Sequence, residues 1–375
     1  MIYIAMNITN QLAKAIQHCQ LSQFDRAIPI LKNILRKKPD QVEAITNLGV
    51  IFAHQKNYKE AERLFDQAQV FGATDRNFLF NLINIKIEMH KIDEASQILK
   101  KLDRNKDAQF YIVKLKLMRI ENKKRIAMDV INDILHSEGR SHYELRFNIA
   151  YTYNYFKLYD NAICLYKELY KENNHNESIL YNLGVSLNNN HQYSEAIEYF
   201  RKAEDYVGFS SNIKKNIAIS LVHQGMYSDA LNELKQCIAI DKTDYDCLMK
   251  IAYILELDGK TDQAIDIYDE VISLEPKFYT ASQDKSYIKL KMGDFHQGWD
   301  LYRYRQYQDL KKCKINDFEI LKIDWQKKIN IYEEQGVGDW VFHLRFLSLV
   351  EKNLHNASVI IDKRFHPLLT DNFQE

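Results

Sequence analysis

Residues 47–68 read NLGVIFAHQKNYKEAERLFDQA, and residues 182–203 read NLGVSLNNNHQYSEAIEYFRKA. Both stretches open on Asn-Leu-Gly and then place a tyrosine, an alanine, a phenylalanine and a second alanine at matching positions. The first of these alanines belongs to a series of small residues at a fixed interval of 34, interrupted once: Ala27, Ala61, Ala95, then Ala162, Ala196, Ala230, Ala264 and Gly298. Ala95 and Ala162 lie 67 residues apart, one short of two periods, and Ala127 marks a degenerate repeat between them. Such a period predicts an array of identical structural units.

The order of small and large residues within one unit predicts two antiparallel helices. Gly49 falls on the first helix and Ala61 on the second, so that the two backbones can approach closely, while larger residues fill the seam at helical spacing. Pro39 and Pro276 stand where a second helix should end, because proline lacks the N–H that a helix interior needs. A single helix pair cannot bury its apolar face, so the pairs are expected to stack.

This period, with an aromatic residue three positions before the alanine, resembles the tetratricopeptide repeat. The resemblance implies one helix pair per repeat and a superhelical array. We therefore expect a mainly α fold: a tetratricopeptide α-solenoid of about nine helix pairs over residues 8–306. A linker over 307–324 and a small, incomplete α/β unit over 325–375 should follow it.

The charge composition argues against partners that bind by long-range electrostatics. Lys plus Arg and Asp plus Glu number 51 each, which gives a net charge near zero. A protein that grips nucleic acid or an anionic membrane usually carries a positive excess, so neither partner is expected. The local basic runs, 36–38 and 123–125, fall near predicted helix ends, where cations are favoured without any ligand.

The cysteines and the N-terminus indicate an ordinary reducing compartment. The five cysteines form no Cys-x-x-Cys pair, and Cys237 replaces a seam alanine, so we expect small apolar side chains and no metal site. The first residues show no basic region followed by an apolar run, as a signal peptide would. No stretch approaches the roughly 20 apolar residues of a membrane span. A cytoplasmic protein without a membrane span is expected.

One polar position recurs on the first helices, which line the concave surface in this kind of repeat. It is an asparagine in five repeats: Asn47, Asn81, Asn148, Asn182 and Asn216. Stacking would place these amides in a row, and an amide that both donates and accepts can hold the backbone of an extended peptide. Val113 interrupts the row, and it ends at Lys250 and Asp284, so Asn148 to Asn216 is its best-defined part.

A similar asparagine ladder lines the repeats of the protein O-GlcNAc transferases, where it holds substrate polypeptides. This resemblance implies an extended peptide or protein segment as the partner. The alternative is that Asn-Leu-Gly is a common composition of this part of the repeat, and that the amide serves only solubility.

The last residues predict a different fold. Residues 329–332 and 358–361 are expected strands, 333–339 a glycine loop and 340–353 a helix, which together make a βαβ unit. Such a loop at a helix N-terminus favours an anion, which makes the following residues the candidate anion-binding set: Gln335, Gly336, Gly338 and Arg345. Ordinary turn chemistry is the alternative.

Several short motifs in this region occur in one order: Gly293-Asp294-Phe295, Gly298-Trp299, Tyr302-Arg303-Tyr304-Arg305, Trp325, residues 334–339, Arg345-Phe346 and Asp362-Lys363-Arg364. Over roughly residues 290–375 this resembles bacterial proteins in which such repeats run into a GT-B-type glycosyltransferase domain, in the style of O-GlcNAc transferases and heptosyltransferases. The resemblance implies Asp339 as a catalytic general base, and the same position also suits a helix N-cap.

The length of this segment argues against activity in the chain as it stands. A GT-B enzyme needs two Rossmann-like halves, and the nucleotide-sugar donor binds mainly to the second. Only 50 residues follow Trp325, enough for one βαβ unit. A nucleotide-sugar would therefore be bound only with a second half, and the chain is expected to be a fragment or a remnant of such an enzyme.

Three functions remain open from the sequence. The first is a peptide-binding scaffold that belongs to a glycosyltransferase whose catalytic domain is truncated here. The second is a plain protein–protein adaptor, in which the C-terminal unit only caps the solenoid. The third is an active sugar transferase acting on protein or glycan acceptors.

Overall fold

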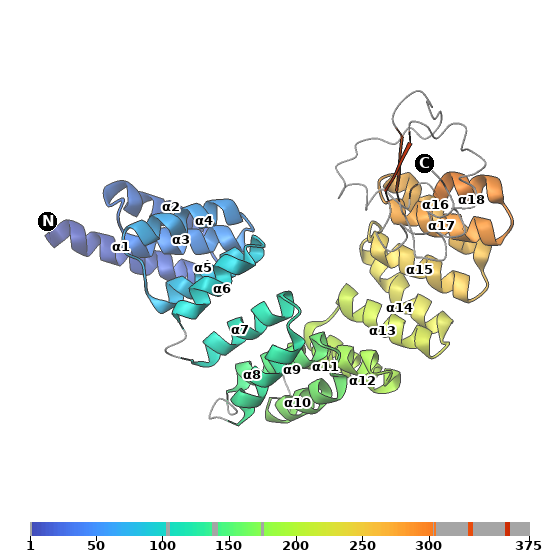
Figure 1. Ribbon diagram of the computed structural model, residues 1–375, viewed down its shortest axis with the longest axis horizontal. Coiled ribbons are helices and arrows are strands. Elements are labelled where there is room, and N and C mark those ends of the chain that lie inside the picture. The colour runs from blue at the N-terminus through green and yellow to red at the C-terminus, as the bar shows by residue number, and fades with distance from the viewer. Residues whose placement is uncertain are drawn as a thin grey trace. The chain divides into compact units, whose positions relative to one another are not determined.

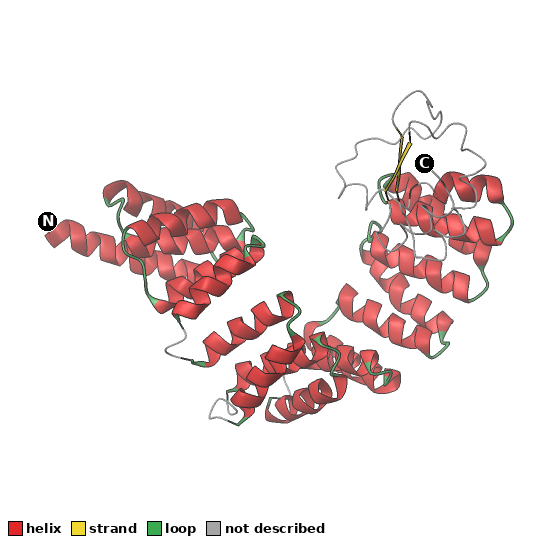
Figure 2. Cartoon of the chain, in the orientation of Figure 1, coloured by secondary structure: helices red, strands yellow, loops and turns green. Residues whose placement is uncertain are grey.

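The computed structural model describes residues 2–102, 106–136, 142–173, 176–302, 304, 329–332 and 357–360. Within these ranges the chain forms 18 helices and two short strands (Figures 1 and 2). The helices are α1 (Ile2–Gln20), α2 (Phe24–Lys37), α3 (Val42–His54), α4 (Tyr58–Val70), α5 (Arg76–Glu88), α6 (Ile92–Lys101), α7 (Ala108–Ile120), α8 (Lys124–Leu135), α9 (Tyr143–Tyr155), α10 (Tyr159–Glu172), α11 (Glu177–Asn189), α12 (Tyr193–Val207), α13 (Ser211–His223), α14 (Tyr227–Ile240), α15 (Tyr245–Leu257), α16 (Thr261–Leu274), α17 (Tyr279–Lys291) and α18 (Phe295–Tyr302). The strands are β1 (Ile329–Tyr332) and β2 (Ala357–Ile360).

The helices form nine consecutive pairs in the described part of the chain, which confirms the predicted repeat. Each small anchor residue is the fourth residue of the second helix of its pair, and each is buried. Ala127 takes this place in α8, so the degenerate repeat is α7–α8. The helices α2 and α16 end two residues before Pro39 and Pro276, as expected.

The chain divides into two compact units, residues 1–276 and 277–375. Eight helix pairs, α1 to α16, make up the first unit. The ninth pair, α17–α18, belongs to the second unit, together with the two strands. The predicted linker 307–324 falls outside the described residues.

Complementary residue sizes define the seam inside each pair. The eighth residue of the first helix contacts the eighth residue of the second in two pairs, Gly49 with Phe65 and Gly184 with Phe200. The residues at the same two positions of the other pairs are Ile83 and Leu99, Leu115 and Ile131, Ala150 and Tyr166, Ala218 and Leu234, and Ala252 and Tyr268. A Cβ atom added to Gly49 would lie 2.7 Å from the Phe65 ring, and one added to Gly184 would lie 2.7 Å from the Phe200 ring. A glycine therefore accompanies a phenylalanine, and an alanine or larger residue accompanies a tyrosine, leucine or isoleucine.

Each turn between the two helices of a pair is closed in one way. The residue in the left-handed region is Ser22, Lys56, His90, Asn122, Lys157, His191, Gly225, Gly259 or Gly293. The next N–H then returns to a carbonyl five residues earlier, as from Asn57 to Phe52 at 2.8 Å. This helix-end motif fixes the antiparallel direction of the second helix.

A buried ion-pair network joins three helices of the first unit. Lys214 of α13 lies 2.6 Å from the Glu204 carboxylate of α12 and 3.0 Å from the Glu233 carboxylate of α14, and Arg201 contacts both acids. The side chains of Lys214 and Glu233 are only 7% and 10% exposed. Burial acts to raise the pKa of Glu233, but hydrogen bonds from Arg201 and Lys214 outweigh it and hold the pKa below its ordinary value. The folded protein therefore favours the charged carboxylate.

The second unit contains the only described strands. β1 and β2 pair in parallel, with Ile329 opposite Ala357 and Tyr332 opposite Ile360. Their positions agree with the expected strands to within one residue. The helix expected between them falls outside the described residues, so the βαβ unit itself stays a prediction.

No helix in the described ranges combines the length and the hydropathy that a bilayer-spanning segment requires.

The seam predicts the effect of adding one methyl group. Replacing Gly184 with Ala should destabilise the protein, because overpacking costs about 1–3 kcal/mol and the helix-propensity gain is about 1 kcal/mol. The Phe200 ring, which is fully buried, cannot move aside freely. Gly184→Ala combined with Phe200→Leu recreates the natural Ala218–Leu234 pair and should recover part of the loss. Urea unfolding measures the free energy of unfolding of each variant. A double variant that loses more stability than the two single variants lose together would contradict the pairing.

The ion-pair network predicts that part of the stability of the fold depends on pH. The pKa of Glu233 is lower in the folded protein than its ordinary value. Glu233 therefore adds to the free energy of unfolding at neutral pH, and this stabilisation disappears as the pH falls through the folded pKa. Glu233→Gln should lower the free energy of unfolding by about 1.5–3 kcal/mol at pH 7, which is the usual contribution of hydrogen bonds to charged groups. Near pH 3 the loss should be much smaller. Glu198→Gln is the control, since its ion pair with Lys202 is exposed. Equal losses at both pH values for Glu233→Gln would refute this assignment.

Candidate binding face

The predicted asparagine row occupies one structurally equivalent position. Each first helix from α3 to α15 has 13 residues, and the row is its sixth residue: Asn47, Asn81, Asn148, Asn182 and Asn216. Val113 and Lys250 are the sixth residues of α7 and α15, as expected, and Asp284 is the sixth residue of α17 in the second unit. The first helices α9, α11 and α13 contact one another in order, so three asparagines lie on neighbouring helices.

Four of these amides are oriented by their own helix. The Nδ2 atoms of Asn47, Asn148, Asn182 and Asn216 donate to the carbonyl four residues earlier, at 2.8, 3.0, 2.7 and 2.8 Å. A carbonyl only accepts, so the nitrogen must face the helix and the Oδ1 atom must point away from it. No hydrogen bond to these four Oδ1 atoms comes from the residues that the structure describes. The row therefore presents acceptor atoms with a fixed orientation.

Asn216 makes one further contact that links two repeats. Its Nδ2 atom also lies 3.1 Å from the Tyr181 hydroxyl of α11. Both N–H groups of Asn216 are thus used inside the protein, whereas Asn148 and Asn182 each keep one N–H that no described residue accepts. These two asparagines can both donate to a ligand and accept from it.

A row of buried hydroxyls lies behind the same three asparagines, and the sequence reasoning missed it. Thr152, Ser186 and Ser220 are the tenth residues of α9, α11 and α13 and are fully buried. Their hydroxyls donate to the backbone carbonyls of Asn148, Asn182 and Asn216, at 2.7, 2.8 and 3.0 Å. The tenth residue of the other 13-residue first helices in this unit is Ile51, Ile85, Leu117 or Ile254. The interval of 34 between these hydroxyls was the signal that could have revealed them.

An apolar row lies beside the amides. The ninth residues of the same helices and of α15 are Tyr151, Val185, Ile219 and Tyr253. Residues three positions apart are neighbours on a helix surface, so this row runs next to the asparagines. Tyr151 is 42% exposed and Tyr253 is 54% exposed, while Val185 and Ile219 are half-buried. We call the surface formed by Asn148, Asn182, Asn216, Tyr151, Val185 and Ile219 the binding face.

Two hollows lie on the preceding first helices. A cavity of about 680 Å³ is lined by Asn47 and Asn81, together with Glu43, Thr46 and Asn77. A second cavity of about 600 Å³ lies at the break of the ladder: Asn84, Asp107, Ile112, Val113, Lys116 and Glu144 contribute to its lining. The first-helix surface is therefore recessed at Asn47 and Asn81 as well as where Val113 replaces an asparagine.

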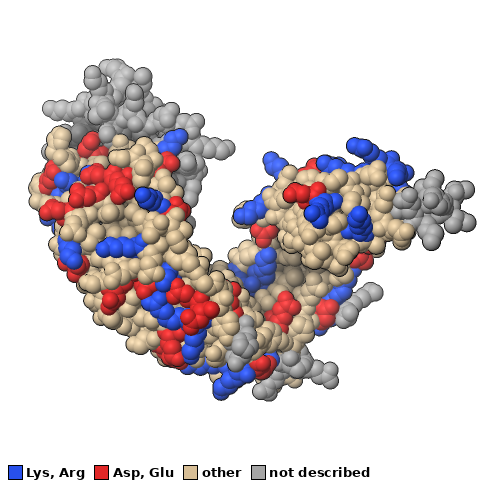
Figure 3. Space-filling view, turned by 180° about the vertical axis from the view of Figure 1, so that it is seen from behind, with Lys and Arg blue, Asp and Glu red and all other residues tan. Residues whose placement is uncertain are grey.

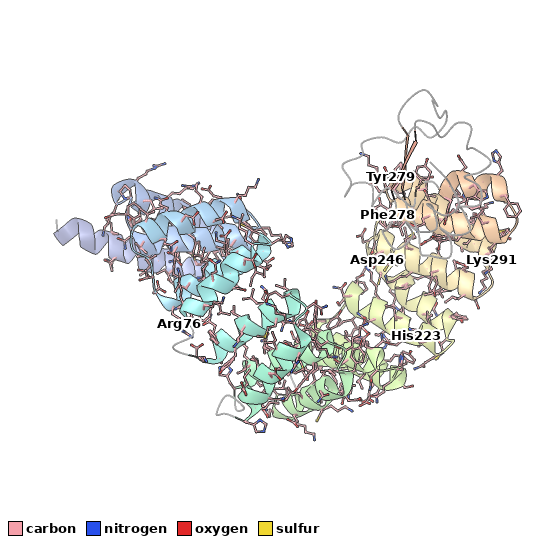
Figure 4. All side chains as sticks on the ribbon, viewed as in Figure 1. Arg76, His223, Asp246, Phe278, Tyr279 and Lys291 are labelled. Carbon is pink, nitrogen blue, oxygen red and sulfur yellow. The ribbon has the colours of Figure 1, made fainter. Side chains whose placement is uncertain are left out.

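Recurring contacts hold successive first helices in register. The first residue of one helix contacts the residue that caps the next: Arg76 with Asp107, Tyr143 with Asn176, and Ser211 with Asp244. The Arg76 guanidinium donates to both Asp107 carboxylate oxygens, at 3.0 and 2.7 Å, and Figure 4 labels Arg76 at the start of α5. The equivalent residues of successive repeats are thereby kept in line.

A cluster of ion pairs joins α13, which carries the last asparagine of the binding face, to the N-terminal part of α15. Lys215 lies 3.0 Å from Asp244 and 2.9 Å from Asp246, and Lys250 lies 2.6 Å from Asp246, which Figure 4 labels on α15. Burial disfavours the charged form of Lys215, but its hydrogen bonds to Asp246 and Asp244 outweigh this effect, and the pKa of Lys215 lies above its ordinary value. Burial likewise opposes the charge on Asp244 and Asp246, and their hydrogen bonds still lower both pKa values. These charges are satisfied internally, so the neutral face ends here.

The remaining predicted site residues fall outside the described residues: Gln335, Gly336, Gly338, Asp339 and Arg345. Among the residues that are described, no cluster of three or more His, Cys, Asp or Glu side chains is placed to hold a metal. On the surface seen in Figure 3, acidic and basic side chains are interspersed.

Comparison with known proteins agrees with the repeated helix pairs. Models of the tetratricopeptide repeat match residues 12–76, 177–206 and 246–277. No curated protein matches the chain. All three matched segments lie within the helical repeats, so they do not bear on residues 290–375.

Solved structures match as well. A tetratricopeptide repeat protein from Parabacteroides merdae ATCC 43184 is 15% identical, with a TM-score of 0.53, over 67% of this chain and 99% of that one. A MamA crystal structure is 22% identical with a TM-score of 0.39, over 44% of this chain and 98% of that one. MamA 41-end from Desulfovibrio magneticus RS-1 is 17% identical with a TM-score of 0.40, over 46% and 97%. The family models show tetratricopeptide repeats in the three matched segments, and the Parabacteroides structure shows that the chain shares the fold of a tetratricopeptide repeat protein.

Proposed function

We propose that the chain is a scaffold that binds an extended peptide or protein segment along the binding face. The observation that carries the proposal is the row of oriented Oδ1 atoms on α9, α11 and α13, next to an apolar row in the same register. An extended backbone presents N–H and C=O groups at short, regular intervals, and asparagine can bond to both. Recognition of this kind depends little on the sequence of the ligand.

The hydrogen bonds within the helices support this use of the amides. Each asparagine is already held by the carbonyl four residues earlier, so little rotational freedom is lost when a ligand binds. Acceptors outnumber donors on the face, because Asn216 has used both of its N–H groups. A bound segment should therefore donate its N–H groups to the face, and the tyrosine, valine and isoleucine side chains should contact apolar residues of the segment.

A finer proposal concerns the C-terminal segment. The parallel pairing of β1 and β2 favours the start of an α/β domain over a helical cap. We propose that the scaffold belongs to a glycosyltransferase, with residues 325–375 as the first part of its GT-B domain and Asp339 as a candidate base. The test is to fuse the chain to a complete second half of a GT-B domain. The fusion protein should then bind a nucleotide-sugar. A fusion that binds none would favour the adaptor.

Removing three amides tests the scaffold proposal. The variant Asn148→Ala, Asn182→Ala, Asn216→Ala should bind peptides more weakly, since each lost hydrogen bond costs about 0.5–1.5 kcal/mol. An array of random dodecapeptides, with fluorescence anisotropy on the best binders, measures the loss. The control replaces three exposed asparagines of second helices, Asn132, Asn161 and Asn232, with Ala.

Circular dichroism should show the same helix content for both variants and for the parent chain. Proline substitution or N-methylation within a bound peptide, which removes N–H donors, should weaken its binding as well. Equal affinity of the parent and the binding-face variant would rule out the asparagine row as the binding element.

A further inference from the structure

A cavity of about 630 Å³ lies between α6 and α7, where the repeat is two residues short. Ala95 of α6 and Ala127 of α8 are 32 residues apart, two fewer than the usual period. The helix α6 has ten residues, whereas the other second helices of the first unit have 12 to 15. In α12 the last turn reaches the next repeat, because Glu204, its twelfth residue, lies 2.6 Å from Lys214 of α13. The shorter α6 has no twelfth residue to take this place.

The inner part of the cavity is apolar. Leu99 of α6 and Phe110, Leu117 and Met118 of α7 line it, and all four are buried. Three of them belong to one hydrophobic cluster that extends over α5, α6 and α7. A cavity of this volume, with apolar walls and a few polar groups, is typical of sites for small molecules.

Two positions that are apolar in most repeats carry polar side chains here, and both line the cavity. Ser96 is the fifth residue of α6. The fifth residue of the other second helices in this unit is apolar, or a glutamate that pairs with Lys86 of the next repeat: Ile28, Glu62, Met128, Ile163, Ile197, Leu231 and Ile265. Lys114 is the seventh residue of α7. The seventh residue of the other 13-residue first helices in this unit is a buried leucine or isoleucine: Leu48, Leu82, Ile149, Leu183, Ile217 and Ile251.

The charges that line the cavity are not balanced. Glu121 and Lys123 lie 3.0 Å apart and compensate each other. Lys100 and Lys114 form no ion pair with a carboxylate in the part of the chain that the structure describes. Asp93 contributes one further negative charge to the lining, so one positive charge remains in excess. A half-buried ammonium at a position that elsewhere holds a leucine is unfavourable unless an anion accompanies it.

We propose that this cavity binds a small molecule that consists of an apolar body and a carboxylate. The body packs against Phe110, Leu117 and Met118, whose flexible side chain adapts to its shape. The carboxylate pairs with Lys114, and Lys100 adds a second positive charge to the same cavity. A single surplus charge matches a carboxylate better than a phosphate monoester, which carries about two negative charges near neutral pH.

This site is separate from the binding face. The binding face uses the sixth and ninth residues of α9, α11 and α13, whereas α7 contributes its third, seventh, tenth and eleventh residues to the cavity. The inference therefore does not depend on the proposed peptide binding.

Two acids and their neutral counterparts test the proposal on the full chain. Decanoate and naphthoate carry an acyl chain and an aromatic body on the same carboxylate, and decanol and naphthamide lack its charge. Isothermal titration calorimetry measures the four affinities. At least one acid should bind about tenfold more tightly than its neutral counterpart, as expected for a charge-assisted bond. The acid that binds more tightly identifies the kind of apolar body.

Ser96→Ile tests the volume of the site. The variant places in α6 the residue that α10 and α12 have at this position, and the larger side chain should fill the cavity. Binding of both acids should be lost, while the melting temperature stays the same or rises, because the added apolar surface is buried. Ser228→Ile, at an exposed position of α14, is the control and should leave binding unchanged.

Lys114→Met tests the charge. Methionine keeps an unbranched apolar side chain and removes the ammonium, so the acid should lose its advantage over the neutral counterpart. Lys235→Met is the control, because Lys235 is the ninth residue of α14, as Lys100 is of α6, and does not line the cavity. Lys114→Leu should remove the same preference and also raise the melting temperature, since it restores the apolar residue of the other repeats. This combination is expected of a residue that serves a ligand and not the fold.

Three results would overturn the inference. The first is that neither acid binds. The second is binding that survives Ser96→Ile, because the ligand would then lie elsewhere. The third is a preference for the acid that Lys114→Met leaves intact. All three would leave the proposed peptide binding untouched, since none of these probes measures it.

Discussion

The close approach of two helices at one residue pair is the constraint on which the repeats depend. At Gly184 the backbone of α11 lies against the Phe200 ring so closely that not even a methyl group fits without movement. The same two positions hold an alanine with a tyrosine or leucine in three other repeats. Because this contact fixes how each second helix lies on its first helix, it also fixes which residues of the first helix face away from the seam.

The binding face is a consequence of that geometry. Once the eighth residue of a first helix points into the seam, the sixth and ninth residues emerge on another side, and the turn and capping contacts keep successive repeats aligned. The repeats then differ mainly in what they place on these outward positions. The central repeats place amides backed by buried hydroxyls, and the repeat that follows places lysine and aspartate, which neutralise each other. The part of the surface in which the amides are backed by buried hydroxyls is thus confined to α9, α11 and α13.

Buried charge in the first unit follows one rule with one exception. Lys86 and Lys214 are each held by two carboxylates from neighbouring helices, which offsets their desolvation. Arg119 is buried to the same degree and has a hydroxyl and an aromatic ring in place of an acid.

The sequence by itself determined the repeat, the nine helix pairs and the equivalence of the asparagines, because period and helix packing follow from residue size at fixed local spacing. It also located two short strands near the C-terminus, from a local run of apolar residues. Only the tertiary structure decided how the polar groups are used. Four of the amides bond within their own helix, whereas the bond from Asn216 to Tyr181 and the bond from Arg119 to Thr152 join different helices. Partners such as Arg119 and Thr152 lie a whole repeat apart in the chain, and no local pattern shows whether a charge so placed will find a counter-ion.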